Sequence, residues 1–237
     1  MSGDGPGGPL ERYKRDAALA AVAAEVRDGM LVGLGSGSTA AYVIREIGRR
    51  VREDGWRIRG VPTSERTAEI AREVGIPLVA LEEAPGVVID GADQVDPSLA
   101  IIKGGGGAHA REKIVATAAR RTVIVADHTK AVPHLTGPVP LEVLPFAASW
   151  IMRVLPERIP GAEARLRTRD GRPFATDNGN PVIDLVCGVI EDPAALAATL
   201  EHMPGVVEHG LFVGIAHVVY FAGPKGIKIE KISRCDV

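Results

Sequence analysis

Residues 88–116, VIDGADQVDPSLAIIKGGGGAHAREKIVA, gather the residue types that proton transfer on an anionic substrate requires. Two carboxylates, Asp90 and Asp93, stand three residues apart, and Lys103 is followed by the four glycines 104–107. Glu112 comes next, in a predicted helix. Glycines let backbone N–H groups approach a ligand because no Cβ intervenes. A glycine run bracketed by charged residues after an apolar strand indicates a site, which a glycine run alone would not.

A second candidate site is the segment GSGST at residues 35–39, which opens a predicted helix after a strand. The unpaired N–H groups and the dipole of a helix N-terminus favour phosphate, and the hydroxyl groups of this segment add donors. Small N-capping residues explain part of the pattern without any ligand. The segment lacks the lysine of a Walker loop and the full dinucleotide fingerprint, so it favours a small sugar phosphate over a nucleotide. The residues concerned are Ser36, Gly37, Ser38 and Thr39.

Strands alternate with helices over the first 130 residues or so, which predicts a parallel sheet covered on both faces. The predicted strands are 30–34, 57–61, 77–81, 87–90 and 122–126, and the predicted helices are 11–27, 40–51, 64–74 and 108–120. In such sheets, functional groups collect at the carboxyl ends of the strands. Residues 35–39, 90–93 and 127–130 each follow a strand directly. We therefore expect one shared site at this edge.

The pattern changes near residue 138 to a β-α-β-β-α-β order, typical of a ferredoxin-like α+β unit. The predicted strands are 139–144, 164–168, 181–186 and 206–213, and the predicted helices are 147–155 and 193–202. Strands in 216–232 rejoin the first sheet. The fold class is thus α/β, with a Rossmann-like parallel-sheet core and a smaller ferredoxin-like domain inserted near the C-terminus. The predicted domains are 1–137 plus 211–237, with 1–10 as a flexible tail, and 138–210.

Composition and charge exclude several classes of protein. The net charge of −2 argues against a broad nucleic-acid surface, which requires a basic stripe. No apolar run approaches the length of a membrane span, and the first residues show no signal-peptide pattern. Cys187 and Cys235 have neither metal-ligand nor disulfide spacing, and the histidines are irregularly spaced. We therefore expect a cytoplasmic protein with reduced thiols and without a metal.

Several segments together resemble the ribose-5-phosphate isomerase A family. They are GLGSGSTA (33–40), DGADQVD (90–96), KGGGGAHAREKIVA (103–116), PLEVLPFA (140–147), TDNGN (176–180) and MPGVVEHGLF (203–212). The match keeps one order over nearly the whole chain. It implies interconversion of D-ribose 5-phosphate and D-ribulose 5-phosphate in the non-oxidative pentose phosphate pathway. It also implies no cofactor and no metal, a homo-oligomer (dimer or tetramer), and no nucleic-acid or membrane partner.

The resemblance also implies roles for individual residues. Glu112 is the general base that transfers the proton in a reaction with an enediolate intermediate. The alternative role of Glu112 is structural, because an acidic residue in the first turn interacts favourably with the helix dipole. The other catalytic residues implied are Asp90, Asp93 and Lys103. The substrate-binding residues implied are Ser36, Gly37, Ser38, Thr39, Asp90, Gly91, Ala92, Asp93, Lys103, Gly104, Gly105, Gly106 and Lys130.

Each of these roles has a simpler alternative. Asp90 and Asp93 fit turn capping after a strand as well as contacts with substrate hydroxyls. Lys103 and Lys130 fit solvated surface lysines. The chain departs from the family at Gln94, where the family usually has Glu, and at Ser36, where it usually has Thr. The first departure removes a charge, and the second keeps a hydroxyl group.

Other functions compete with the isomerase. Another sugar-phosphate enzyme on a related α/β scaffold, such as an amino-sugar-phosphate deaminase or a different aldose–ketose isomerase, is the nearest rival. A sugar-phosphate sensor without catalysis is a rival from a different class. Such a regulator would normally carry a DNA-binding helix-turn-helix, and the sequence shows neither this element nor a basic patch.

Overall fold

The computed structural model describes residues 7–232, and within this part the chain forms two compact units. The first unit contains the residues up to Ala92, Ile114–Ala131 and the residues from Ile215 on, and the second contains Asp93–Lys113 and Val132–Gly214. The second unit contains the predicted smaller domain, 138–210, and in addition 93–113, 132–137 and 211–214. Segment 93–113 joins the second unit through an antiparallel pairing of Ile101–Ile102 with Leu211–Phe212.

A six-stranded sheet forms the centre of the first unit, in the order β15-β14-β6-β3-β1-β2. All its pairings are parallel except that of β14 with β15. The strands are β1 (Leu31–Leu34), β2 (Arg59–Pro62), β3 (Val87–Asp90), β6 (Thr122–Asp127), β14 (Val218–Gly223) and β15 (Gly226–Lys231). The predicted parallel α/β core is confirmed, and the C-terminal strands do rejoin this sheet.

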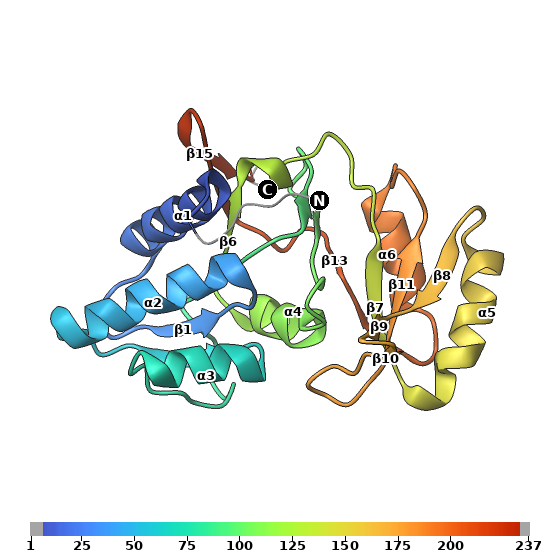
Figure 1. Cartoon of the computed structure of the whole chain (residues 1–237), viewed down its shortest axis with the longest axis horizontal. Helices are drawn as coiled ribbons and strands as arrows, with labels where there is room; N and C mark the ends of the chain where they lie inside the picture. Colours follow the sequence, from blue (N-terminus) through green and yellow to red (C-terminus); the bar gives the residue numbers. More distant parts are fainter. Residues whose placement is uncertain (1–6, 233–237) are drawn as a thin grey trace. The chain divides into compact units, whose positions relative to one another are not determined.

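Helices cover both faces of this sheet. They are α1 (Pro9–Glu25), α2 (Ser38–Glu53), α3 (Glu65–Glu73) and α4 (His109–Ala118). The short 3₁₀ helix η1 (His128–Lys130) follows β6 directly, at the carboxyl edge of the sheet. Helices α1 and α2 pack against each other (Figure 1), and their apolar faces join Val32 and Leu34 in one core. Gly33 points to the opposite face, where a Cβ would lie 2.7 Å from Val115 of α4. The glycine therefore lets α4 pack closely onto β1.

The second unit is built on a four-stranded antiparallel sheet in the order β12-β7-β11-β8. Its strands are β7 (Val139–Val143), β8 (Glu163–Leu166), β11 (Val182–Val186) and β12 (Val206–His209), and its helices are α5 (Ala148–Arg158), α6 (Pro193–Glu201) and the 3₁₀ helix η2 (Pro145–Ala147). The chain order β-α-β-β-α-β confirms the ferredoxin-like prediction. Asp192 caps α6, since its side chain accepts a hydrogen bond from the N–H of Ala195 at 2.9 Å.

Short strands complete the second unit. They form a three-stranded sheet, β13-β5-β4, and a hairpin, β9-β10. The strands are β4 (Gln94–Val95), β5 (Ile101–Ile102), β9 (Thr168–Arg169), β10 (Arg172–Pro173) and β13 (Leu211–Phe212). The sequence did not predict the small sheet, because two-residue strands carry no readable alternation.

Three predicted elements differ from the structure. The predicted strand 206–213 is two strands, β12 and β13, which belong to different sheets. The predicted strand 77–81 is wrong, because only one bridge, between Leu78 and Gly60, forms there. Pro77 has no N–H to donate to a ladder, which favours such an interrupted edge. The first helix begins at Pro9, two residues before the predicted start, so the predicted tail 1–10 is too long. Residues 1–6 of that tail lie outside the described part of the chain, as does Cys235.

Candidate active site

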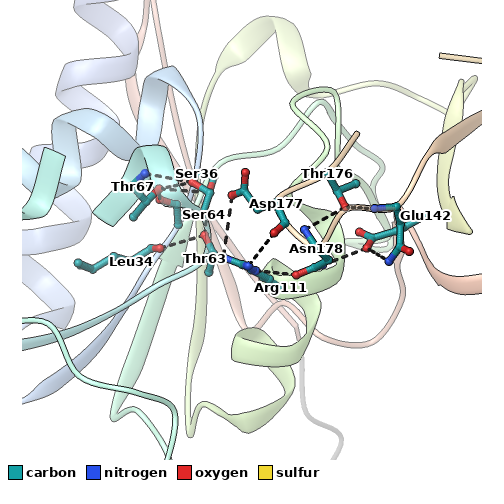
Figure 2. A network of polar contacts seen from close by, with 12 residues as sticks. Leu34, Ser36, Thr63, Ser64, Thr67, Arg111, Glu142, Thr176, Asp177 and Asn178 are labelled. Carbon is teal, nitrogen blue, oxygen red and sulfur yellow. Dashed lines mark hydrogen bonds and ion pairs between the residues drawn. The ribbon is translucent and has the colours of Figure 1, made fainter. Parts of the chain in front are cut away.

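The loop after β1 is held by a cluster of hydroxyl groups in the first unit (Figure 2). The Oγ of Ser36 lies 2.8 Å from the Oγ1 of Thr63, 2.9 Å from the Oγ of Ser64 and 3.2 Å from the Oγ1 of Thr67. Gly37 precedes α2 with φ +93°, a conformation that favours glycine. The Ser36 hydroxyl is therefore used within the protein, whereas Ser38 is exposed in the first turn of α2.

Asp90, at the carboxyl end of β3, holds the same loop. Its Oδ1 accepts the N–H of Ser36 at 3.0 Å and the N–H of Gly91 at 2.7 Å. A Cβ on Gly35 would lie 2.3 Å from the Asp90 carboxyl group, so only glycine fits there. One oxygen of Asp90 therefore orients the loop 35–37, which is a structural contribution in addition to the role that the resemblance implies.

Lys130 lies at the same edge of this sheet. Strand β6 is the neighbour of β3, and Asp127 at its end caps η1 by accepting the N–H of Thr129 at 3.0 Å. Lys130 is the last residue of η1 and is half-buried. The carboxyl ends of β1, β3 and β6 therefore bring the loop 35–39, Asp90 and Lys130 to one edge of the sheet, as expected for a doubly wound fold.

The second unit holds Lys103 and Glu112 as a buried pair, with the exposed Asp93 and the glycine loop beside them in the sequence or by contact. The ammonium nitrogen of Lys103 lies 3.3 Å from the Oε2 of Glu112, and the two side chains are only 4% and 5% exposed. The Oδ2 of Asp93 accepts the N–H of Gly105 at 2.9 Å. Lys103 is therefore not the solvated surface lysine of the alternative interpretation. The two side chains thus form a close pair of a basic and an acidic group that is shielded from bulk water.

The glycine loop 104–107 follows Lys103 with two residues in the left-handed region, Gly104 at φ +100° and Gly107 at φ +81°. A Cβ on Gly104 would lie 2.7 Å from His109 and from Pro140. Gly106, in contrast, is exposed and has no heavy atom within 4 Å of its Cβ position. The loop is therefore tightly packed at Gly104 and open at Gly106.

His109, at the start of α4, is an uncharged anchor. Its Nε2 accepts the backbone N–H of Glu142 at 3.1 Å. Burial, together with the positive charges of Arg167 and Lys113, lowers its pKa to about 3. The neutral ring fixes the first turn of α4 but contributes no charge near Glu112 at neutral pH.

The neighbours of Glu112 in sequence are also anchored. The Nζ of Lys113 donates to Glu208 at 2.6 Å, and burial lowers the pKa of this lysine. The Nε of Arg111 donates to the Oδ1 of Asn178 at 2.8 Å. Residues on both sides of the candidate base are thus tied to other parts of the second unit.

A buried glutamate supports the Arg111 contact, as Figure 2 shows. Glu142 on β7 has no exposed surface, and its Oε1 accepts from Asn178 at 3.0 Å and from Asn180 at 2.7 Å. Sequence reasoning missed Glu142. The only signal was that PLEVLPFA and TDNGN both belong to the family pattern.

The departure at Gln94 has a local explanation. Its Nε2 donates to the Oγ1 of Thr136 at 3.0 Å, and its Oε1 accepts the N–H of Thr136 at 2.8 Å. A glutamate would have to take the first contact in the opposite direction, with the Thr136 hydroxyl as the donor. The amide at position 94 therefore serves to hold the segment before β7.

Comparisons with known proteins identify the family. The family model described as ribose 5-phosphate isomerase A (phosphoriboisomerase A) matches residues 59–226. The chain belongs to this family. A protein of Natronomonas pharaonis named ribose-5-phosphate isomerase A is 53% identical over 227 residues, covering 94% of this chain and 98% of that protein. A protein of Chloroflexus aurantiacus with the same name is 50% identical over 230 residues, which cover 95% of this chain and 95% of that protein.

Solved structures of the isomerase A family share the fold. Ribose 5-phosphate isomerase A of Methanocaldococcus jannaschii is 41% identical, with a TM-score of 0.88 over 93% of this chain and 99% of that chain. A D-ribose-5-phosphate isomerase in complex with phospho-erythronic acid is 38% identical, with a TM-score of 0.88 over 94% and 99% of the two chains. The chain is accordingly an isomerase.

Metal-ligand clusters and membrane-spanning helices are both absent from residues 7–232. Among them, no group of three or more His, Cys, Asp or Glu side chains is arranged to hold a metal ion. In this same range, no helix combines the length and the apolar composition that crossing a membrane requires.

Proposed function

We propose that the chain interconverts D-ribose 5-phosphate and D-ribulose 5-phosphate through an enediolate, with Glu112 as the general base. The observation that carries this proposal is the buried Lys103–Glu112 pair, 3.3 Å apart, beside an open glycine loop. A carboxylate abstracts the proton, and an ammonium group and backbone N–H groups stabilise the negative charge that develops on oxygen.

The proton balance requires only one carboxylate. Glu112 takes the proton from C2 of the open-chain aldose, and the electrons form the C1–C2 double bond of the enediolate. The same carboxylic acid then returns a proton to C1, while the hydroxyl proton on O2 is transferred to O1. Lys103 stabilises the oxygen that bears the negative charge. Asp90 and Asp93 contact the sugar hydroxyl groups and assist ring opening.

The phosphate group binds the loop 36–39 in this proposal. The exposed start of α2 at Ser38 and Thr39 offers backbone and hydroxyl donors, and Lys130 at the same sheet edge adds a positive charge. Gly91 and Ala92, which follow Asp90 directly in the sequence, are proposed to contact the sugar as the family resemblance implies. Binding energy from the phosphate then helps to position the reacting carbon.

Membership of the family also suggests the oligomeric state, the partners and the cellular location of the protein. We expect a cytoplasmic homo-oligomer, a dimer or tetramer, in the non-oxidative pentose phosphate pathway, without nucleic-acid or membrane partners. Exposed apolar side chains in the second unit support self-association, since Phe146 is 100% exposed and Trp150 is 58% exposed. Light scattering after size exclusion would measure the molar mass.

The test of the proposed function uses purified protein treated with a chelator. Ribose 5-phosphate should be converted to ribulose 5-phosphate, whereas ribose should be a very poor substrate and glucosamine 6-phosphate should not be deaminated. Absence of ribulose 5-phosphate, or activity that requires an added divalent ion, would contradict the proposal.

A further inference from the structure

Arg167, which follows β8, reaches the glycine loop from within the second unit. Its Nη1 donates to the carbonyl oxygen of Gly104 at 2.8 Å and to that of Gly105 at 3.2 Å. The other side of the guanidinium binds Asp184 on β11, with Nε 2.9 Å from Oδ2 and Nη2 paired to Oδ1. The Arg167 side chain is 14% exposed. It therefore joins the strand to the loop as a fixed, planar fork.

The two accepted carbonyls determine where the loop's N–H groups point. In a trans peptide, the C=O of one residue and the N–H of the next point to opposite sides of the peptide plane. Because Arg167 holds the Gly104 carbonyl, the Gly105 N–H points away from it and donates to Asp93 at 2.9 Å. Because it also holds the Gly105 carbonyl, the Gly106 N–H points away as well. Gly106 is the open position of the loop, with no heavy atom within 4 Å of its Cβ position.

A second contact fixes the far end of the loop. A Cβ on Gly107 would lie 2.3 Å from the Phe174 ring, so this ring packs directly on the glycine backbone. The Phe174 N–H donates to the Arg167 carbonyl at 2.9 Å, which closes the β9–β10 hairpin at its base. The guanidinium of Arg169 lies 4.5 Å from the centre of the same ring. Arg167 and Phe174, at the base of the β9–β10 hairpin, thus both contact the glycine loop 104–107.

We propose that Arg167 is a positioning residue for the isomerisation, which aims the backbone N–H of Gly106 at the substrate oxygen that becomes negative in the enediolate. This inference rests on the proposed function. Donors that are already oriented before the reaction stabilise developing charge without reorganisation. A loop of four glycines would otherwise sample many backbone conformations. The largely buried guanidinium adds a restraint on the two peptide planes, beside the Gly107 N–H bond to the Gly104 carbonyl at 3.0 Å.

The test removes the Arg167 guanidinium group and leaves the residues proposed to contact substrate unchanged. Arg167→Met removes all its donors, and the double variant Arg167→Met/Asp184→Asn also removes the charge left unpaired on Asp184. We expect kcat to fall about 10- to 100-fold in both, as for a misplaced catalytic group. KM for ribose 5-phosphate should change little, because the phosphate contacts are untouched. Arg167→Lys should restore only part of kcat, because an ammonium group cannot bridge Asp184 and two carbonyls.

Binding of two probes separates positioning from a general loss of structure. Phospho-erythronic acid carries a carboxylate in place of the reacting carbons, whereas ribitol 5-phosphate has the phosphate and no such charge. The Arg167 variants should lose affinity for phospho-erythronic acid by the same factor as kcat and keep their affinity for ribitol 5-phosphate. Equal losses for both probes would contradict the proposal.

Arg165→Met is the matched control. Arg165 lies two residues earlier on β8, pairs with Glu163 and is 62% exposed, so its loss removes one positive charge without touching the loop. Its kcat should equal that of the wild type. An active wild type whose folded Arg167→Met variant keeps normal kcat would overturn the role of Arg167 alone. An inactive wild type would refute the proposed function instead.

Discussion

Glu142→Ala should strongly destabilise the protein, although Glu142 is not expected to contact substrate. The side chain has no exposed surface, and its Oε1 accepts two amide N–H bonds, from Asn178 at 3.0 Å and from Asn180 at 2.7 Å. A hydrogen bond to a charged group contributes about 1.5–3 kcal/mol. Removing the acceptor breaks both bonds, but Asn178 is exposed and Asn180 half-buried, so water replaces part of what their amides lose. We therefore expect the free energy of unfolding to fall by about 3 kcal/mol, the lower end for two such bonds.

Glu142→Gln should cost much less. The glutamine side chain keeps an oxygen that accepts both amides, but the bonds lose their charge assistance, which roughly halves their strength. The expected loss is about 1–2 kcal/mol. Urea unfolding at fixed pH and protein concentration measures both variants. Glu157→Ala is the control, since Glu157 is 61% exposed and makes a surface ion pair with Arg153. If the free energy of unfolding falls in Glu142→Ala by no more than about 0.5 kcal/mol beyond its fall in Glu157→Ala, the reasoning is refuted.

Two other predictions concern the phosphate loop and the buried histidine. Ser38→Ala with Thr39→Ala should raise KM for ribose 5-phosphate by about tenfold or more, because donors to a charged group are lost; an unchanged KM in steady-state assays would contradict it. The folded pKa of His109, about 3, lies below its ordinary value of 6.5, so the unfolded chain binds the extra proton and stability falls as pH drops from 6.5 toward 3. The free energy of unfolding of the wild type should fall between pH 7 and pH 5 by about 2 kcal/mol more than that of His109→Gln, as measured by urea unfolding. Equal decreases in the two proteins would show that His109 does not titrate this way.

The sequence predicted much of the fold because its signals are local. Alternation of apolar strands and helices located the parallel sheet, and with it the edge that carries the loop after β1, Asp90 and Lys130. The β-α-β-β-α-β order likewise predicted the antiparallel sheet of the second unit. The glycine run and the charges around it marked the buried cluster of Lys103 and Glu112.

Long-range partners escaped prediction because no local pattern encodes them. Arg167 is one of several arginines in a polar segment of the sequence. Gly104 and Gly105, whose carbonyl groups it binds, lie 63 and 62 residues earlier in the chain, so only the fold brings them into contact. Glu142 looks like a polar interruption of a β strand until Asn178 and Asn180 are placed beside it. Asp90 was predicted as a substrate ligand, but its bonds to the loop backbone require the three-dimensional neighbourhood of Ser36.

The central claim is that Glu112 moves the proton. The most direct test follows ribose 5-phosphate by NMR in D₂O, with wild-type protein and with Glu112→Gln, which keeps the size of the side chain but removes the proton acceptor. The wild type should form ribulose 5-phosphate carrying deuterium at C1. The variant should bind sugar phosphate while turnover and deuterium incorporation fall together by about 10²–10⁴-fold or more. Near-normal turnover and incorporation in the variant would contradict the claim and assign the base to another residue.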